Sequence, residues 1–203
     1  MRGAVLAGGI ASRYAGQPKG LLPVGGRRIL DRVVDAIRTA TGAAPLLVAN
    51  DPGAPDWRPD LECMPDLIRG AGSLGGILTA VAAGPGPVLC VAWDMPFVPA
   101  ALLETLVREG GGDSCDALLP VSGSPRGGGL EPLCAVYGPA CRGPIEAAIA
   151  RGDYRAVAFH DAVRVGTLSL DRTRAFGDPD ELFFNVNRPE DLERAEGLWR
   201  RRG

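Results

Sequence analysis

Short apolar segments alternate along the chain with segments of helical periodicity. Apolar segments rich in β-branched residues predict six strands, over residues 3–6, 45–50, 87–93, 117–121, 133–137 and 163–168. Apolar spacing of three or four and helix-start signals predict helices, over residues 29–37, 74–81, 101–107, 144–150 and 188–202. The alternation predicts an α/β fold with a mostly parallel central sheet covered by helices on both faces. Functional residues should then lie in the loops that follow the strands.

Length and charge narrow the class of protein. A chain of 203 residues with 46% hydrophobic side chains fits one domain, over residues 1–203. The 22 basic and 24 acidic residues give a net charge of -2, which offers no overall attraction for nucleic acid or an anionic membrane. No apolar run is long enough to cross a bilayer, and glycines come too early for a signal peptide. We expect a cytoplasmic protein with no nucleic acid and no membrane as partner.

Cysteine and histidine usage excludes several kinds of site. The five cysteines are widely spaced and include no C-x-x-C pair, which argues against a disulfide framework and a zinc site. A single histidine excludes a multi-histidine metal centre. A serine hydrolase is not supported either, because the chain has no G-x-S-x-G motif.

The loop after the first predicted strand has the character of a phosphate site. Residues 6–19 read L-A-G-G-I-A-S-R-Y-A-G-Q-P-K. Glycines let backbone N–H groups approach an anion, and Arg13 and Lys19 would neutralise a triphosphate and then the departing pyrophosphate. The alternative is a glycine-rich turn with solvated Arg13 and Lys19. The loop is not a Walker A motif, because it lacks the G-x-x-x-x-G-K-[ST] string.

Asp94 is the candidate metal ligand. It follows the apolar segment 87–93 directly, so it should lie at the edge of the sheet where ligands bind. A carboxylate there suits Mg²⁺, which usually takes one or two protein carboxylates and completes its shell with water and substrate phosphates. The alternative is an aspartate that caps a helix or stabilises the turn before Pro96.

Two further polar residues fall near the same edge. Asn50 ends the second predicted strand, and Asp66 precedes a glycine-rich segment. Residues 70–75 of that segment spell G-x-G-x-x-G, and Asp94 follows at nearly the spacing of a dinucleotide-binding fingerprint, which keeps a dehydrogenase as an alternative. Against it, the glycines do not directly follow an apolar strand. Close packing of a helix on the sheet explains these glycines equally well.

Residues 183–192 form the third distinctive segment and read F-F-N-V-N-R-P-E-D-L. Asn185 and Asn187 lie two apart in an extended stretch, so we expect them to point the same way, toward phosphate oxygens or metal-bound water, just before a helix N-terminus that favours anions. The alternative is that Asn187 only caps the helix that starts at Pro189.

Together these segments resemble the molybdenum cofactor guanylyltransferase family. Residues 6–19 resemble its L-A-G-G-x-S-x-R-M-G-x-x-K signature, residues 66–76 its aspartate followed by G-P-L-x-G, and residues 183–192 its F-x-N-V-N-x-P-E-E-L segment. Residues 131–137 resemble the family's strand that helps form the cofactor's binding surface. The resemblance implies a three-layer, Rossmann-like nucleotidyltransferase fold.

The resemblance also implies a reaction and a set of site residues. The expected reaction transfers GMP from GTP to the terminal phosphate of molybdopterin or molybdenum cofactor and releases pyrophosphate, with Mg²⁺ as cofactor. Arg13, Lys19 and Asp94 are expected to be catalytic, and Asp94 to hold the metal. The expected nucleotide-binding residues are Leu6, Ala7, Gly8, Gly9, Lys19, Asn50, Asp66 and Asp94. Transient complexes with other molybdenum cofactor biosynthesis proteins are expected from the family.

Two other functions remain open. One is a related nucleotidyltransferase that uses CTP or another phosphate acceptor, although L-A-G-G is similar to the guanylyl branch and the cytidylyl relatives carry A-A-G. The other is a non-catalytic GTP-binding module. The Gly/Pro-rich segment 122–129 predicts a mobile loop that acts as a lid. Four arginines after residue 120 are candidates for an anionic pterin phosphate but are typical of solvated surface positions, namely Arg126, Arg151, Arg155 and Arg164.

Overall fold

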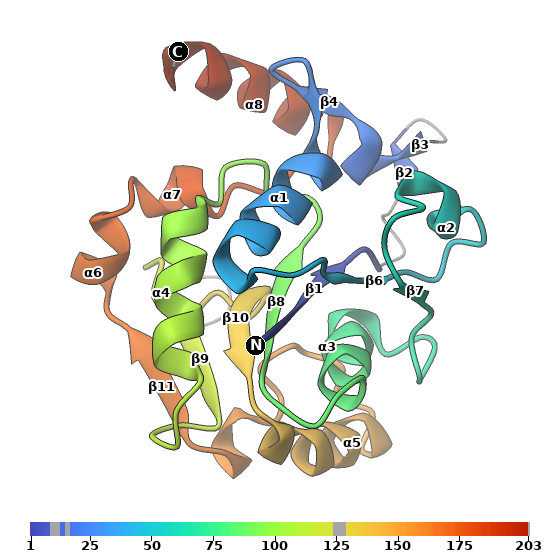
Figure 1. Cartoon of the computed structure of the whole chain (residues 1–203), viewed down its shortest axis with the longest axis vertical. Helices are drawn as coiled ribbons and strands as arrows, with labels where there is room; N and C mark the ends of the chain where they lie inside the picture. Colours follow the sequence, from blue (N-terminus) through green and yellow to red (C-terminus); the bar gives the residue numbers. More distant parts are fainter. Residues whose placement is uncertain (9–12, 15–16, 124–128, 203) are drawn as a thin grey trace.

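Seven strands form a central sheet between two layers of helices (Figure 1). The structure is a computed structural model that describes residues 1–8, 13–14, 17–123 and 129–202. The strand order across the sheet is β11-β9-β10-β8-β1-β6-β7. The strands are β1 (Arg2–Leu6), β6 (Leu46–Val48), β7 (Cys63–Met64), β8 (Val88–Ala92), β9 (Ala117–Pro120), β10 (Cys134–Tyr137) and β11 (Val165–Leu168).

The sheet is parallel except for β10, which runs antiparallel to both of its neighbours, β8 and β9. Val121, just after β9, forms an antiparallel bridge with Leu130, just before β10. The chain therefore runs in opposite directions in β9 and β10. The start of β10 therefore lies at the edge where the parallel strands end. The prediction of a mostly parallel sheet in an α/β fold is confirmed.

Each face of the sheet is covered by a pair of helices. Helices α1 (Ile29–Thr41) and α4 (Ala100–Gly110) pack on one face, and α3 (Gly72–Ala82) and α5 (Arg142–Ala150) on the other. Side chains alternate between the faces along a strand. In β1, Val5 contributes to the core under α1 and α4, whereas its neighbours Ala4 and Leu6 contribute to the core under α3 and α5.

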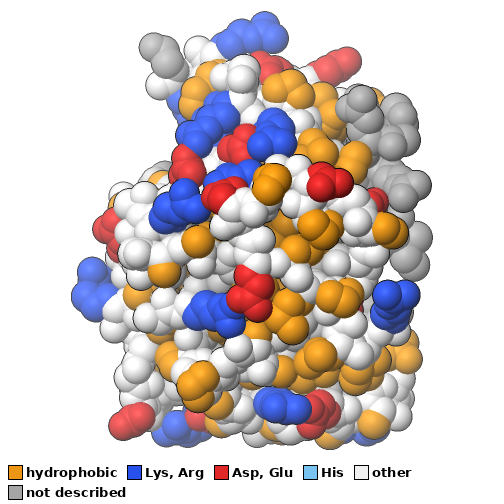
Figure 2. Space-filling model, turned by 45° about the vertical axis from the view of Figure 1, so that its right-hand side comes forward, with side chains coloured by type: hydrophobic (Ala, Val, Ile, Leu, Met, Phe, Trp, Pro, Cys, Tyr) orange, Lys and Arg blue, Asp and Glu red, His pale blue; other side chains and the backbone are white. Residues whose placement is uncertain are grey.

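The last helix, α8 (Pro189–Arg202), lies across a small hairpin of β4 (Pro23–Val24) and β5 (Arg27–Arg28), at the top of Figure 1. Pro189 opens the helix, as its fixed φ favours. Figure 2 shows basic side chains gathered at this end of the molecule among interspersed acidic ones. The hairpin connects the loop after β1 to α1. Because α8 packs on this hairpin, it also stabilises the chain next to the expected phosphate loop.

Three side chains fasten α8 to this hairpin. The Arg32 guanidinium lies 3.8 Å from the centre of the Trp199 ring and donates a hydrogen bond of 2.6 Å to the carbonyl of Val24. Glu196 accepts a hydrogen bond of 2.9 Å from the backbone N–H of Gly25. Gly25 has a φ of 58°, and a Cβ at this residue would overlap the indole of Trp199. The turn therefore requires glycine both for its backbone conformation and for its contact with the helix.

The structure also contains short elements that the hydrophobic pattern did not predict. They are β7, the two-residue strands β2 (Arg13–Tyr14) and β3 (Gln17–Pro18), the hairpin β4–β5, the helices α2 (Ala54–Trp57), α6 (Leu170–Arg174) and α7 (Pro179–Leu182), and the 3₁₀ turns η1 (Lys19–Leu21), η3 (Pro139–Cys141) and η4 (His160–Ala162). Elements of two to five residues are too short to show a period. Residues 124–128 of the predicted lid lie outside the described residues. None of the described helices has the length and apolar character needed to span a membrane.

We predict that Gly25→Ala destabilises the protein more than Gly26→Ala does. Both glycines have positive φ, 58° and 74°, so alanine costs roughly 1–2 kcal/mol at either position. Only Gly25 contacts Trp199, whereas a Cβ at Gly26 meets no atom within 4 Å. The overlap should add about 1–3 kcal/mol. Urea denaturation of the two variants measures the difference, and Trp199→Ala should remove the additional loss from Gly25→Ala. Equal losses in the two single variants would contradict the packing role of the turn.

Candidate active site

Four neighbouring strands end in a row at one edge of the sheet, and a candidate residue follows each of them. Across the row β8-β1-β6-β7, Asp94 follows β8, Gly8 follows β1, Asn50 follows β6 and Asp66 follows β7. The chain builds β6 and β7 on one side of β1 and then crosses to β8 on the other. Such a switch point at the carboxyl ends of strands is where open α/β sheets bind ligands.

Asn50 and Asp66 form one end of this row. The Asn50 side chain donates to the Asp66 carboxylate at 2.6 Å and accepts from the backbone N–H of Asp66 at 2.9 Å. A Cβ on Gly8 would lie 3.8 Å from the Asp66 carboxylate, and a Cβ on Gly76 would lie at the same distance. The structure thus brings together Gly8, Asn50 and Asp66 from three separate segments.

Burial disfavours the charged form of the Asp66 carboxylate. Burial raises its pKa from the ordinary value, and the hydrogen bond from Asn50 lowers it by less. Its Oδ1 atom is buried and has no hydrogen-bond partner among the described residues. A buried acceptor without a donor is unfavourable, so this position favours a ligand that brings an N–H or O–H group.

Lys19, Asp94 and Asn187 meet at the centre of the site. The Lys19 ammonium donates to Asp94 Oδ2 at 2.5 Å and to Asn187 Oδ1 at 2.7 Å. Lys19 and Asp94 are buried, with 7% and 6% of their surface exposed. The backbone N–H of Val186 also donates to the carbonyl of Asp94 at 3.0 Å. The contact therefore joins the loop after β1, the end of β8 and the segment before α8.

Packing behind Lys19 holds it in place. The 3₁₀ turn η1 starts at Lys19, and a Cβ on the next residue, Gly20, would overlap the ring of Trp93. Trp93 is fully buried and stacks on Trp57, with ring centres 5.1 Å apart. The residue before Asp94 thus packs against the residue after Lys19, and their charged neighbours are held side by side.

The Asp94 carboxylate fits the expected magnesium ligand. Its Oδ1 atom is buried without a hydrogen-bond partner among the described residues, and a cation satisfies such an oxygen. No cluster of three or more histidine, cysteine, aspartate or glutamate side chains occurs in the described part of the chain. A single carboxylate is nevertheless enough for Mg²⁺ when substrate phosphates and water complete its shell.

A cavity of about 720 Å³ continues the row beyond Asp94. We call it the edge cavity. It lies between the segment that enters β10, with Glu131, and the segment from α7 into α8, with Phe184, Asn187 and Arg194. Asn187 is thus shared between the edge cavity and the contact with Lys19. Burial raises the pKa of Glu131, and a hydrogen bond from Ser122 opposes that shift.

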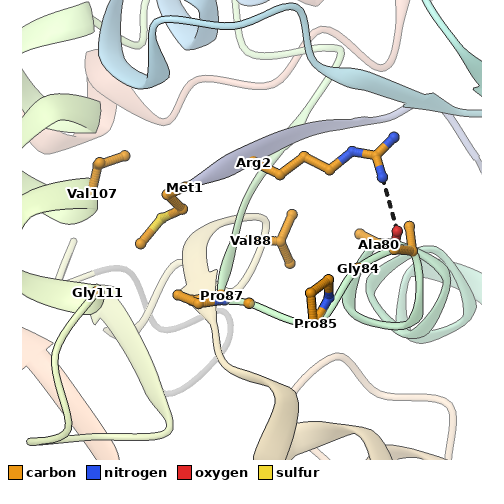
Figure 3. A pocket seen from close by; sticks show the side chains of 11 residues that line it. Met1, Arg2, Ala80, Gly84, Pro85, Pro87, Val88, Val107 and Gly111 are labelled. Carbon is orange, nitrogen blue, oxygen red and sulfur yellow. Dashed lines mark hydrogen bonds between the residues drawn. The ribbon is translucent and has the colours of Figure 1, made fainter.

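A second cavity lies at the opposite edge of the sheet. It has a volume of about 530 Å³ and is lined by residues at the amino ends of β1 and β8, among them Met1, Arg2 and Val88 (Figure 3). Arg2 donates to the carbonyl of Ala83 at 2.9 Å and pairs with Glu62. This cavity is separated from Asp94 by the length of the strands.

The structure places some of the predicted residues differently. Leu6 ends β1, and the N–H of Ala7 donates to Val48 at 2.8 Å. The Asn185 side chain donates back to the carbonyl of Phe183 at 2.9 Å, so it does not join Asn187 at Lys19, although both line the edge cavity. The Asn185 side-chain amide thus makes a local hydrogen bond that the alternation of residues along the sequence cannot predict.

Asn187 does not act as the helix cap that was the alternative for it. Its side-chain oxygen accepts from Lys19, while Asp191 accepts from the backbone N–H groups of Asn187 and Arg188 at 3.0 and 2.9 Å. Asp191 therefore stabilises the start of α8 and leaves the Asn187 side chain to the site.

Two of the candidate residues, Gly9 and Arg126, lie outside the described residues, and Arg13 is described only through its place in β2. Their expected roles stay predictions.

Sequence reasoning missed Gly20 and Trp93, whose contact the hydrophobic pattern does not reveal. Glu131 is the first residue of the segment 131–137 that resembles the family's cofactor-binding strand.

Comparison with known proteins identifies the family. The model of the MobA-like NTP transferase domain matches residues 3–165. The chain belongs to the MobA-like NTP transferase family. It is 36% identical to the molybdenum cofactor guanylyltransferase of Desulfosudis oleivorans, over 96% of this chain and 93% of the relative. It is 35% identical to the probable molybdenum cofactor guanylyltransferase of Pelotomaculum thermopropionicum, over 95% of this chain and 90% of the relative.

Solved structures agree with this assignment. The chain superposes on molybdopterin-guanine dinucleotide biosynthesis protein A from Archaeoglobus fulgidus with a TM-score of 0.82 and 30% identity, over 99% of this chain and 100% of the other. The predicted nucleotidyltransferase fold is therefore confirmed, and the chain is an enzyme of the NTP transferase class. Membership of this family also rejects the dehydrogenase alternative for the G-x-G-x-x-G string at residues 70–75.

We predict that Asp66→Asn changes the pH dependence of stability and weakens nucleotide binding. Because the native pKa of Asp66 is raised, the folded wild type loses stability as pH rises through that pKa. The variant carries no such charge, so its melting temperature relative to wild type should rise between pH 4 and pH 7.5. Loss of a charged acceptor should weaken binding of a nucleoside triphosphate roughly 10- to 100-fold. Thermal melts across pH and calorimetric titration measure both effects, and a pH-independent offset would refute the buried charge.

Proposed function

We propose that this enzyme is a molybdenum cofactor guanylyltransferase. It transfers GMP from GTP to the terminal phosphate of molybdopterin or molybdenum cofactor and releases pyrophosphate. The observation that carries the proposal is the buried contact of Lys19 with Asp94 and Asn187 at the switch point of the sheet. The names of the relatives support the choice of GTP and of the cofactor as substrates.

The order of these residues along the sheet edge suggests the orientation in which GTP binds. The guanosine lies toward Asn50 and Asp66, where a buried carboxylate oxygen lacks a donor. The triphosphate lies over the loop after β1, with the backbone at Gly8 and Gly9 and the side chain of Arg13 as its contacts. The α-phosphorus then lies near Lys19 and Asp94, next to the edge cavity.

Charge neutralisation is the main task of the protein in this reaction. The attacking cofactor phosphate is already anionic, so no general base is needed, and repulsion between the two phosphates is the obstacle. The Lys19 ammonium has three N–H donors, and among the described residues its bonds to Asp94 and Asn187 leave one for a phosphate oxygen. Those two bonds fix the ammonium before the substrate arrives, which favours a preorganised electrostatic contribution.

Asp94 is the residue that would hold Mg²⁺. When bound there, the ion would supply further positive charge to the phosphates and the departing pyrophosphate. Asn187 and Asn185 remain candidate contacts to phosphate or metal-bound water. A cytoplasmic location fits a GTP-consuming biosynthetic enzyme, and transient contacts with other molybdenum cofactor biosynthesis proteins fit the direct handover of its product.

The reaction is tested by supplying molybdopterin, Mg²⁺ and either GTP or CTP to the purified enzyme and detecting products by mass spectrometry. We predict a guanine dinucleotide and pyrophosphate from GTP and no dinucleotide from CTP. Product from CTP would overturn the guanine preference. Nucleotide binding without product from either would favour the non-catalytic module or another acceptor.

We further predict that Asp94→Asn lowers turnover at least roughly 100-fold while the protein still binds GTP. The variant keeps the shape of the side chain but removes its charge. Asp171→Asn is the matched control, because the Asp171 side chain lies on α6 and is 94% exposed. Steady-state kinetics and calorimetric GTP titration measure the two effects. Retained turnover in Asp94→Asn would remove Asp94 from the mechanism.

A further inference from the structure

The segment that follows Asp66 is not held in place by burial of its own side chains. The side chains of Leu67 and Ile68 are 54% and 38% exposed, and Arg69 and Gly70 are exposed as well. Exposed side chains contribute little packing to hold a loop in one conformation. Asp66 itself is buried, with 7% of its surface exposed. Its position therefore depends on the hydrogen bonds of the backbone around it.

The two backbone N–H groups that flank the Cα atom of Asp66 are held by two different elements. The N–H of Asp66 donates to the side-chain oxygen of Asn50 at 2.9 Å. The N–H of Leu67 donates to the hydroxyl of Thr79, also at 2.9 Å. Asn50 follows β6, whereas Thr79 lies within α3. The backbone at Asp66 is thus tied both to the end of a strand and to a helix.

The Thr79 hydroxyl has a fixed direction. The Thr79 residue is 0% exposed, and its hydroxyl donates to the carbonyl of Gly75, one turn earlier in α3, at 2.9 Å. A hydroxyl has one proton to donate, so this bond leaves the oxygen as the acceptor for Leu67. The loop packs closely on the helix here, because a Cβ on Gly75 would lie 3.0 Å from the carbonyl oxygen of Ile68.

The same turn of α3 adjoins the Asp66 carboxylate. A Cβ on Gly75 would lie 3.6 Å from Oδ2 of Asp66, and a Cβ on Gly76 would lie 3.8 Å from Oδ1. Oδ1 is the buried oxygen that has no hydrogen-bond partner among the described residues. Movement of the Leu67 peptide away from α3 would displace this oxygen. An acceptor that is held in place before the ligand arrives gives tighter binding than one that must first be ordered.

We propose that Thr79 is a positioning residue for the nucleotide site: its hydroxyl holds the peptide after Asp66 and so directs the Asp66 carboxylate toward the nucleotide. This inference rests on the proposed function only for the contact between Asp66 and the nucleotide. Thr79 is fully buried, so its effect on affinity passes through Asp66. Its bond to Gly75 stays within α3, and its bond to Leu67 is the one that connects the helix to the site.

Removal of the hydroxyl tests this role. Binding is measured by calorimetric titration in Mg²⁺ with whichever of GTP and CTP wild type binds more tightly. Thr79→Val keeps the shape of the side chain and Thr79→Ala leaves a cavity, yet we expect both to weaken nucleotide binding to the same extent, roughly 3- to 30-fold. Thr79→Ser keeps the hydroxyl and should bind within about twofold of wild type. Urea denaturation checks that each variant is folded at the temperature of the titration.

Thr105→Val is the matched control. Thr105 is also a buried threonine within a helix, and its hydroxyl donates to the carbonyl of Ala101, four positions earlier, at 3.1 Å. Among the described residues its hydrogen bonds stay within α4, with Arg108 as the other partner. This variant loses a comparable hydroxyl on the other face of the sheet, so its affinity for the nucleotide should equal that of wild type.

A double variant separates positioning from a general loosening of the fold. If Thr79 acts through Asp66, Thr79→Val should change affinity by no more than about twofold in a protein that already carries Asp66→Ala.

Five results would overturn the inference. They are unchanged affinity in Thr79→Val and Thr79→Ala, a loss in Thr79→Ser as large as in Thr79→Val, an equal loss in Thr105→Val, a full additional loss in the Asp66→Ala background, and no nucleotide binding by wild type. Turnover decides the proposed function separately. Absence of a dinucleotide product would overturn that function, whereas the affinities of these variants would still decide the role of Thr79.

Discussion

The buried contact between Lys19 and Asp94 organises the whole candidate site. An ion pair in a protein interior loses much of its solvation, and its attraction does not by itself make such a pair stabilising. Removing one partner leaves a buried charge, so the pair constrains the two segments that form it. Asn187 completes the contact from the far end of the sequence. The result is an ammonium group that is held in position at the switch point of the sheet before any substrate binds.

Packing on both sides of the Lys19–Asp94 contact keeps its segments in place. Gly20 allows the turn after Lys19 to pack against Trp93, the residue before Asp94. Helix α8 follows Asn187 and is fastened through Trp199 to the hairpin that follows Lys19. The loop after β1 and the segment before α8 are therefore tied at two places. In the proposed reaction the nucleoside lies beside the ends of β6 and β7, and the phosphates lie beside the ends of β1 and β8.

The sequence predicted the sheet well because six strands are apolar segments long enough to show their character. It also indicated that Asp94, Asn50 and the loop after β1 share one edge, since all three follow predicted strands; Asp66 follows β7, which the hydrophobic pattern did not predict. It could not reveal that Lys19 bonds to Asn187 across 168 positions, because such a contact depends on how α8 returns over the hairpin. The direction of Asn185 depends on a local hydrogen bond.

The most direct test of this account is a crystal structure of the enzyme with Mg²⁺ and a GTP analogue that it cannot cleave. The account predicts the base beside Asn50 and Asp66, the α-phosphate beside Lys19, and the metal on Asp94. A nucleotide whose phosphates lie in the edge cavity, or in the cavity at the amino ends of β1 and β8, would contradict it.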